Sequence, residues 1–430
     1  MLSPGAEIVL TLDKAVAGGR MLGRHDGQVI LVSGAIPGER VRARITHVSR
    51  RVAHGDTVEI LEAHPDRRES DIKGACGGAV YAHIKYPRQL SLKSEIVADA
   101  FIRIAKSALP RAVTVAPSQE HGYRMRARLH AKDGRIGFFR EGTHELCDAA
   151  ATRQLLPATT SIIDRFVTAA VRERPNQLVS VELAENVPAT ERVLHMEWRT
   201  LDDAARLAEL DFTGLTGVTC ATQQKTAVDV IQGVPHVTEV LQLPRHDGTT
   251  DTELRLRHHV RSFFQGNRWL LQTSVTNVVT QVSSDQVVDL YSGVGVFAVS
   301  LAALGRQSVV AVEGNPVSAR DLDANAAPYG DAIRVHATAV EEYLRRESNS
   351  LEKATVVLNP PRTGLSTEAI TGLVARRPPQ LVYMSCDVPT LARDVRALMD
   401  RGYRLGHLEA FDLFPNTAHV ESLAVLTRGE

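Results

Sequence analysis

Two side chains near the end of the chain have the types and settings that covalent catalysis and proton transfer require. Cys386 follows an apolar run and precedes Pro389, a favoured first residue of a helix. The dipole at a helix N-terminus lowers the pKa of a nearby thiol and favours the thiolate, although a lone cysteine is usually inert. Glu421 directly precedes the apolar run 422–427. It is either a solvated residue at a strand edge or a partly buried carboxylate with a raised pKa.

Two polar residues that adjoin other apolar runs could belong to the same site. Asn359 ends the run 356–358 and is followed by two prolines. The residue before a proline is held extended, so Asn359 is expected at the C-terminal edge of a strand, where open α/β sheets bind ligands. A structural turn is the alternative. Gln265, in Phe-Phe-Gln-Gly-Asn, is either a polar cap on a strand end or a site residue.

A nucleotide-like cofactor site is indicated by the stretch that precedes these residues. The apolar run 287–290 predicts a buried strand and 297–304 a helix packed on it, with Gly293 and Gly295 in the turn between them. Because glycine lacks a Cβ atom, the backbone can approach a ligand closely at the helix N-terminus. A second apolar strand ends at Glu313, whose carboxylate is placed to hold ribose hydroxyls.

The identity of the cofactor is not decided by the glycines alone. Residues 293–298 also satisfy the G-x-G-x-x-G/A dinucleotide fingerprint, so an NAD-dependent dehydrogenase is an alternative. However, Asp289 lies four positions before the first glycine, and a carboxylate suits a cationic cofactor better than a pyrophosphate. This arrangement resembles the S-adenosylmethionine methyltransferases. Nothing downstream suits hydride transfer, so the dehydrogenase interpretation is disfavoured.

Composition and charge limit the class of protein. Of the 430 residues 43% are hydrophobic, which is ample for packed cores in two or three domains, and 50 Lys and Arg balance 50 Asp and Glu. A dedicated nucleic-acid binder is usually more basic, so contacts with nucleic acid are expected from local patches only. We expect no membrane span and no signal peptide. Four scattered cysteines are too few for a disulfide scaffold, and we expect a cytoplasmic monomer.

The N-terminal segment, residues 1–62, is expected to form a small β domain. The strand-like runs 7–12, 28–33, 40–48 and 57–61 are separated by segments that contain Gly-Gly, Asp-Gly and Pro-Gly turns. Within the run that starts at Arg40, strict alternation places Arg40, Arg42 and Arg44 on one face. This face is either solvated or a phosphate-contacting surface for RNA. The stretch 35–41 also resembles the TRAM domain, an OB-like barrel that is appended to RNA-modifying enzymes.

The rest of the chain divides into two expected domains. Residues 63–250 predict an α/β or α+β middle domain for RNA recognition, with an amphipathic helix over 89–106. The polar, turn-rich stretch 243–250 is a plausible boundary. Residues 251–430 then hold the cofactor turn and the polar strand ends, which predicts a Rossmann-like α/β domain.

In this order the motifs resemble the RNA uracil-C5 methyltransferase family over nearly the full length. The resemblance implies a class I S-adenosylmethionine-dependent enzyme that methylates tRNA or 23S rRNA. It implies Cys386 as the nucleophile that adds to uracil C6 and Glu421 as the base that removes the C5 proton. It places the cofactor and the target base among Gln265, Tyr291, Gly293, Gly295, Glu313 and Asn359. The base must be unstacked to react, which implies base flipping or a looped substrate.

A second resemblance concerns the segment that begins at Cys76. It is similar to the iron–sulfur segment of bacterial members of the family, but Ala79, Ser70 and Thr152 stand at about the positions of the other three cysteines. A [4Fe–4S] cluster requires four thiolates. We therefore predict no cluster and no other metal. Cys147 is displaced from the pattern and is expected to be a buried structural cysteine.

Departures from the family pattern leave other functions open. The family usually has Asp at the position of Asn359, Asn at that of Asp387, and a polar residue at that of Val296. Loss of the Asp charge near a sulfonium could weaken cofactor binding or slow turnover. An N-methyltransferase that uses Asn359-Pro-Pro is one alternative, although such enzymes need an aromatic residue where Arg362 stands. A non-catalytic RNA-binding protein that kept the fold is another.

Overall fold

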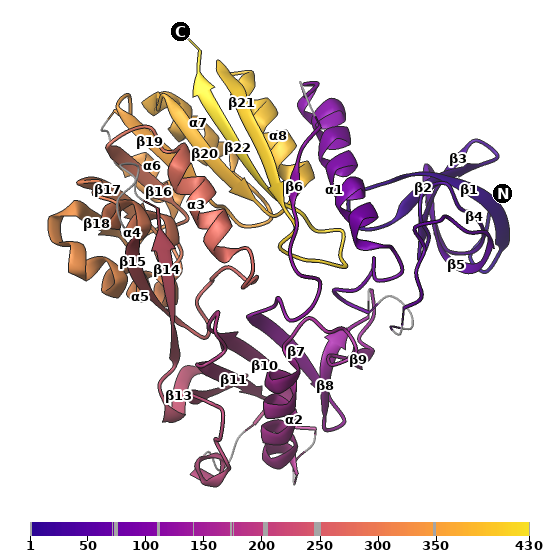
Figure 1. The fold of residues 1–430 in the computed structure, drawn as a ribbon, viewed down its shortest axis with the longest axis horizontal. Helices are drawn as coiled ribbons and strands as arrows, with labels where there is room; N and C mark the ends of the chain where they lie inside the picture. Colours follow the sequence, from indigo (N-terminus) through magenta and orange to yellow (C-terminus); the bar gives the residue numbers. More distant parts are fainter. Residues whose placement is uncertain are drawn as a thin grey trace.

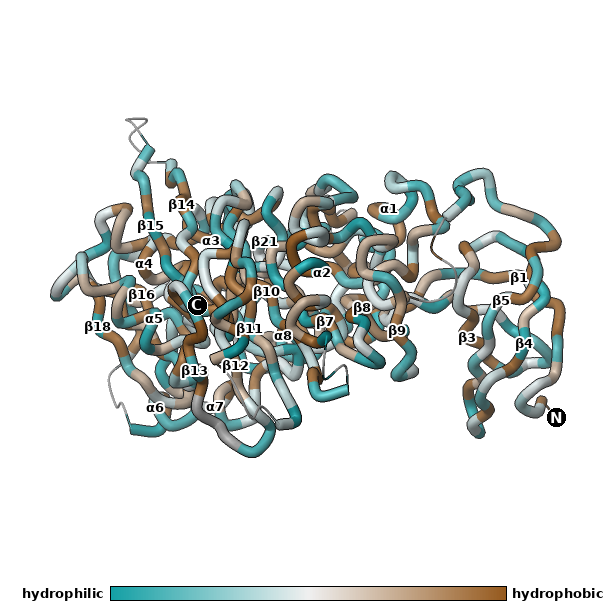
Figure 2. The backbone as a smooth tube through the Cα atoms, turned by 90° about the horizontal axis from the view of Figure 1, so that it is seen from below, coloured by the Kyte–Doolittle hydropathy of each residue, from teal (hydrophilic) through white to brown (hydrophobic). Residues whose placement is uncertain are grey.

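The computed structural model describes residues 2–70, 72, 76–109, 112–140, 142–172, 174, 176–200, 205–244, 251–346 and 350–429. It consists of an N-terminal barrel, a middle sheet that packs on one long helix, and a C-terminal sheet covered by helices (Figure 1). The barrel lies at one end of the elongated molecule (Figures 1 and 2). Within the described ranges, no helix is long and apolar enough to cross a membrane.

The N-terminal part is a closed barrel with the strand order β1-β2-β3-β5-β4. Its strands are β1 (Glu7–Ala15), β2 (Met21–His25), β3 (Gln28–Ser33), β4 (Arg40–Val48) and β5 (Val52–Glu62). The predicted alternation of β4 is confirmed, because its apolar side chains are buried in the barrel and Arg40 and Arg44 point outward. Strand β2 was not predicted, since its short apolar run is interrupted by Gly23.

The middle part is a seven-stranded sheet with the order β13-β12-β11-β10-β7-β8-β9. Its strands are β7 (Arg126–Lys132), β8 (Arg135–Phe139), β9 (Leu146–Asp148), β10 (Leu178–Glu185), β11 (Arg192–Trp198), β12 (Gly217–Thr222) and β13 (Lys225–Gly233). Helix α2 (Pro157–Val171) packs Ile163 and Phe166 into the core of this sheet, and a short helix η2 (Ala205–Glu209) lies nearby. The strand pairs are antiparallel except β11 with β12, so the part is of the α+β class.

The C-terminal part is an eight-stranded sheet with the order β18-β17-β16-β19-β20-β22-β21-β6. Its strands are β6 (Val115–Ala116), β16 (Gln286–Leu290), β17 (Ser308–Val312), β18 (Ile333–His336), β19 (Ala354–Leu358), β20 (Gln380–Ser385), β21 (Tyr403–Phe411) and β22 (Glu421–Arg428). The five strands β16 to β20 are parallel. The chain runs outward from β16 to β18 and then returns to β19 on the other side. The predicted Rossmann-like fold is confirmed, and its switch point lies between β16 and β19.

Helices cover both faces of this sheet. One core contains α3 (Leu271–Gln281), α4 (Val296–Ala303) and α5 (Pro316–Ala326), with the short helix η3 (Ala327–Ala332) after α5. The other contains α1 (Tyr86–Ala100), its continuation η1 (Phe101–Ala105), α6 (Val340–Arg346), α7 (Thr367–Arg376) and α8 (Val388–Met399). Because parallel strands are buried on both faces, they are continuously apolar, as the run 354–358 is.

Elements from the range predicted as the middle domain pack with the C-terminal sheet. Helix α1, which begins three residues before the predicted start at Gln89, contacts α8 through the core that contains Val97 and Val395. Strands β14 (His236–Leu243) and β15 (Thr252–His259) form a two-stranded ribbon whose Leu241 and Leu256 join the other core. The ribbon projects from the body of the molecule (Figure 2). Most of the predicted boundary, residues 245–250, lies outside the described residues.

Cys147 is a buried structural cysteine, as the sequence predicted, but its bonding partner was not predicted. It forms a disulfide with Cys76 across 71 positions of the chain. The backbone explains the pairing, because Cys76 bridges to Arg140 at the end of β8, and β8 pairs with β9, which holds Cys147. Both cysteines are buried in the core of the middle part. The long separation along the chain hid this contact in the sequence.

Candidate active site

The carboxyl ends of four adjacent strands bring the predicted site residues to one edge of the C-terminal sheet. Leu290 at the end of β16 pairs with Val312 of β17 on one side and Leu358 of β19 on the other. Tyr291, Glu313 and Asn359 follow these three strand ends, and Cys386 follows β20. Strand β22 runs antiparallel beside β20, with Ser422 opposite Ser385. Glu421, its first residue, therefore lies at the same edge as the thiol.

The glycine turn between β16 and α4 has the backbone conformation that its sequence predicted. Gly293 and Gly295 have φ angles of 59° and 91°, a left-handed region that disfavours other residues. A Cβ atom on Gly295 would lie 2.7 Å from side-chain atoms of Leu322 and Val299. One on Gly293 would meet nothing closer than 3.7 Å. Gly295 is thus required by packing, whereas Gly293 leaves room beside the turn.

Asp289 does not face a cofactor, which corrects the interpretation of that carboxylate. It is fully buried, and its Oδ2 atom accepts a hydrogen bond of 3.0 Å from the main-chain N–H of Ala298 in the first turn of α4. Burial raises the pKa of Asp289 to about 7. The residue therefore holds the helix to the strand beneath the cofactor turn.

Glu313 and Tyr291 line this turn from two sides. The Glu313 carboxylate accepts hydrogen bonds from the main-chain N–H groups of Gly293 (2.8 Å) and Asn315 (2.6 Å). It is half-buried, and burial raises its pKa although these N–H groups oppose the shift. Tyr291 has a φ of 62°, and its hydroxyl lies 3.5 Å from a carboxylate oxygen of Glu341. A carboxylate at the end of β17 fits the ribose of a nucleoside-containing cofactor.

Asn359 and Gln265 border the same turn. The main-chain N–H of Asn359 bonds to the carbonyl of Leu290 at 3.4 Å, so the residue stays beside the end of β16. Its side chain is half-buried. Gln265 is 6% exposed and lies in a segment whose Phe263 approaches Gly293. Phe263 itself is 61% exposed, which leaves an aromatic surface beside the turn.

Cys386 is half-buried one residue before Asp387, the N-cap of α8. Asp387 accepts a 2.9 Å hydrogen bond from the main-chain N–H of Thr390. The expected lowering of the thiol pKa is wrong. Burial raises the pKa of Cys386, and the nearby Glu421 adds to the increase, while Arg362 opposes both. The Asp387 carboxylate already accepts a hydrogen bond from the N-terminal turn of α8. This end of the helix therefore adds little stabilisation of a thiolate at Cys386.

Glu421 is a buried carboxylate, one of the two alternatives that the sequence left open. It is 4% exposed, and burial raises its pKa to about 8, with Arg362 again opposing the shift. Arg362 is itself exposed. One guanidinium thus acts on both the thiol and the carboxylate. In the sequence, Arg362 served only as evidence against an N-methyltransferase. A cation that directly follows a Pro-Pro turn at a strand end could have indicated a residue of the active site.

Helix α1 fixes the loop that leads into Glu421, which the sequence did not predict. Lys93 and Asp412, both fully buried, form an ion pair. The Lys93 ammonium also donates to the carbonyl of Phe414 at 3.0 Å. Gln89 and Asn416 exchange two hydrogen bonds of 2.9 Å through the Gln89 side chain. The loop 412–417 is therefore held by buried polar groups, which are costly to break.

The outward arginines of β4 are each paired with a carboxylate from a neighbouring strand. Arg40 pairs with Glu62, Arg42 with Glu59, and Arg44 with Glu7, at 2.8–3.2 Å. The sequence between Arg40 and His54 contains no acid, but β1 and β5 supply acids in space. The face is exposed and nearly neutral.

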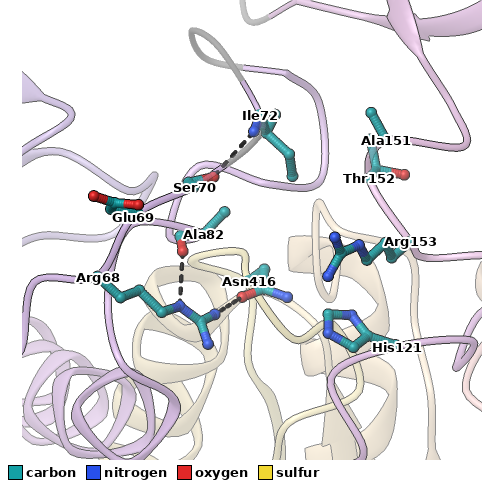
Figure 3. Close-up of a pocket in the computed structure, with 10 residues that line it drawn as sticks. All are labelled: Arg68, Glu69, Ser70, Ile72, Ala82, His121, Ala151, Thr152, Arg153 and Asn416. Carbon is teal, nitrogen blue, oxygen red and sulfur yellow. Dashed lines mark hydrogen bonds between the residues drawn. The ribbon is translucent and has the colours of Figure 1, made fainter.

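The positions that correspond to the cluster cysteines of the family do not hold four thiols. Ser70 and Thr152 line one cavity (Figure 3), and Cys76 and Cys147 are bonded to each other. Hydroxyls and a disulfide do not match the thiolate ligands that iron–sulfur clusters use. Among the described residues, no group of three or more His, Cys, Asp or Glu could hold a metal ion.

Comparisons with known proteins agree with the geometry. The family model "tRNA (Uracil-5-)-methyltransferase" matches residues 85–429, and the TRAM domain model matches residues 7–58. An uncharacterized RNA methyltransferase from Streptomyces avermitilis is 30% identical, with 98% of each chain covered. A 23S rRNA (uracil(1939)-C(5))-methyltransferase from Pseudomonas putida is 29% identical over 98% of this chain and 93% of that protein.

A solved structure shares the fold. The Pyrococcus abyssi tRNA (uracil-54, C5)-methyltransferase, in complex with S-adenosyl-L-homocysteine, has a TM-score of 0.75 and 23% identity, covering 97% of this chain and 99% of that chain. The family model spans most of this chain and includes the whole edge of the sheet where the cofactor turn, the thiol and the buried carboxylate meet. The chain therefore belongs to the tRNA (uracil-5-)-methyltransferase family and carries a TRAM domain ahead of its catalytic part.

Proposed function

We propose that this protein methylates C5 of a uridine in tRNA or 23S rRNA, with Cys386 as the nucleophile and Glu421 as the base. The observation that carries the proposal is the meeting of these two side chains at one sheet edge, with Glu421 close enough to raise the pKa of the Cys386 thiol. A buried carboxylate with a pKa of about 8 is well matched to proton transfer near neutral pH.

The role of the cysteine follows from the weak nucleophilicity of uracil C5. Addition of the Cys386 thiolate to C6 forms a C–S bond and an enolate whose nucleophilic carbon is C5. Arg362 favours the thiolate because its positive charge opposes the effects of burial and of Glu421. S-Adenosylmethionine, when bound, supplies the electrophilic methyl group.

The role of the glutamate follows after C5 has been alkylated. The carboxylate of Glu421 removes the C5 proton, and the electron pair of that C–H bond expels the Cys386 thiolate and restores the C5–C6 double bond. Its burial strengthens its basicity relative to an exposed carboxylate. The loop 412–417 and β22 keep this base beside the thiol, since Lys93 and Gln89 fix the loop.

The cofactor contacts are proposed on the same grounds. Gly293 leaves room beside the turn, and Glu313 and Gln265 provide oxygens for hydroxyl and amino groups. Asn359 offers an amide oxygen but no charge near the sulfonium, so we expect weaker cofactor binding than a carboxylate would give. Calorimetric titration of S-adenosylmethionine into the wild type and Asn359→Asp tests this expectation. No binding to either protein would favour a non-catalytic RNA-binding protein.

The target can be found by mass spectrometry of nucleosides. A deletion strain should lack one 5-methyluridine in either tRNA or 23S rRNA, and the wild-type gene should restore it while the Cys386→Ala gene should not. Unchanged 5-methyluridine in both RNAs would contradict the proposal. Methylation of RNA by Cys386→Ala would favour an N-methyltransferase instead.

A further inference from the structure

A cavity lies between the segment that follows the barrel, the middle part and the loop before β22. Its volume is about 130 Å³, well above the roughly 10–15 Å³ that a cavity needs to hold one water. The segment after the barrel, the middle part and the loop before β22 supply its lining: Arg68, Glu69, Ser70, Ile72, Ala82, His121, Ala151, Thr152, Arg153 and Asn416 (Figure 3). It is separate from the cofactor turn.

Nitrogen donors from two parts of the chain converge in this cavity. The side-chain amide of Asn416, the guanidinium of Arg153 and the ring of His121 lie toward one another, while Glu69 points away on the far side of Arg68 (Figure 3). The other nearby carboxylate, Glu120, is bound to Arg68 by hydrogen bonds of 3.1 and 2.5 Å. The side of the cavity formed by Asn416, Arg153 and His121 therefore presents nitrogen donors.

Asn416 is built to present its amide nitrogen. The residue is only 6% exposed. Its Oδ1 atom already accepts hydrogen bonds from Arg68 at 2.8 Å and from Gln89 at 2.9 Å. Its main-chain N–H and carbonyl are bonded to Gln89 and Tyr81. The side-chain nitrogen is thus left to meet a ligand, and Figure 3 shows it directed toward Arg153.

The backbone of the lining is held in an unfavourable conformation at two points. Arg153 and Asn416 have φ angles of 53° and 63°. Non-glycine residues adopt this left-handed region rarely, and such residues gather at functional sites. Tyr291 at the cofactor turn is another member of this small group, with a φ of 62°. The left-handed backbone at Arg153 and Asn416 sets the direction in which each side chain leaves the main chain.

We propose that this cavity binds a phosphate of the RNA backbone close to the uridine that is methylated. Arginine and asparagine side chains are common donors to phosphate oxygens, and such contacts fix the register of the nucleic acid without reading its sequence. Asn416 belongs to the loop that leads to Glu421, so a phosphate held there would set the path of the RNA toward the active site. The inference rests on the proposed function, because it takes RNA as the substrate.

The test compares RNA binding by three variants with that of the full-length wild type. Arg153→Gln removes a cation from the lining, and Asn416→Asp keeps the Oδ acceptor but puts a second oxygen in place of the donor. Arg165→Gln is the matched control, since Arg165 is an exposed arginine of the same part on α2, paired with Asp211. The probe is a transcript containing the uridine found by nucleoside mass spectrometry, and affinity is measured across a range of salt concentrations.

The expected result is that Arg153→Gln neutralises one phosphate fewer than the wild type. The slope of log K against log salt should fall by about 0.7 to 0.9, which is about five- to eightfold in affinity at 0.1 M salt. Asn416→Asp should bind RNA more weakly than the wild type, Arg165→Gln should match the wild type, and S-adenosylmethionine affinity should be unchanged in all three. Melting temperatures check that each variant is folded. If Asn416→Asp is not folded, the result for Arg153→Gln alone decides the test.

Three outcomes separate the possibilities. Wild-type affinity and salt slope in Arg153→Gln would overturn the inference while leaving the proposed function intact if the wild type methylates the transcript. A wild type that neither binds nor methylates RNA would overturn the proposed function itself. Stabilisation of the wild type by inorganic phosphate that is absent in Arg153→Gln, together with equal RNA slopes, would mean that the cavity takes a free anion and would overturn the RNA assignment.

Discussion

At the scale of single residues, the site couples two groups that must both lose a proton before they act in the mechanism we propose. Burial raises the pKa of both Cys386 and Glu421, and the charge of Glu421 raises that of the thiol further. Arg362 is the cation that opposes these effects at both positions. The guanidinium of Arg362 therefore favours the thiolate and the carboxylate together.

Replacing Arg362 by Gln should shift the pH dependence of methylation to higher pH. Without the cation, the pKa values of both Cys386 and Glu421 rise further, and because both groups act when deprotonated, the rising limb of the rate profile moves upward. Single-turnover rates from about pH 6 to about pH 10 measure the shift. Arg362→Lys keeps the charge and is the control that should restore most of the profile. An Arg362→Gln profile with the wild-type midpoint would show that the charge does not act on these groups.

Glu421 should also influence stability, with a defined sign. Its pKa is about 8 in the folded protein against an ordinary value of 4.5, so the folded state binds more protons between these values. Stability should fall as pH rises from about 5 to 8, by at most about 1.4 kcal/mol per pH unit from this group. Glu421→Gln should lose this part of the slope in urea unfolding at several pH values. An unchanged slope would mean that the carboxylate is solvated.

At the scale of elements, the sequence predicted what is local and missed what joins distant segments. The apolar runs of β16, β19 and β20 correctly predicted that Asn359 and Cys386 lie at strand ends. Apolar runs and the prolines that follow them can be recognised from neighbouring residues alone. The Cys76–Cys147 disulfide and the Lys93–Asp412 pair join positions far apart in the chain, so no spacing indicated them. The thiol pKa was mispredicted for the same reason, because the burial of Cys386 and the approach of Glu421 through the pairing of β20 and β22 both depend on the tertiary structure.

The segment that holds the disulfide should contain no iron. Protein purified without oxygen should be colourless, because three of the four expected cluster positions carry no thiol. Cys76 and Cys147 should resist maleimide labelling in unfolded protein until a reductant is added, and reduction should lower the unfolding free energy by about 2–4 kcal/mol. Cys220→Ser is the control that leaves the pair intact. Stoichiometric iron and sulfide with visible absorbance would contradict the prediction.

At the scale of the whole molecule, the barrel offers a second surface for RNA besides the phosphate cavity that we propose. The exposed arginines of β4 are paired with glutamates, and ion pairs at such exposed sites are weak. A phosphate can therefore compete for the guanidinium groups, but each exchange releases a carboxylate that opposes RNA. We expect this face to contribute to RNA affinity, but to contribute less than three unpaired arginines would.

Replacing Arg40, Arg42 and Arg44 together with Gln should weaken RNA binding and flatten its salt dependence. The change in slope should be at most about 0.7 to 0.9 for each phosphate that the variant no longer binds. Filter binding over a range of salt concentrations measures it, with Arg165→Gln again as the control for removal of a surface charge. A salt slope equal to that of the wild type would show that the face is only solvated.

The most direct test of the covalent mechanism is the fate of the protein–RNA adduct on a denaturing gel. Glu421→Gln should add its thiol to C6 and transfer the methyl group, then stall, so that a covalent complex with RNA survives denaturation. Cys386→Ala should bind RNA and cofactor yet form no such complex. RNA with 5-fluorouridine should trap the wild type in the same way, because fluorine cannot leave as a cation. Normal turnover by Glu421→Gln, together with no Cys386-dependent adduct on 5-fluorouridine RNA, would contradict the mechanism.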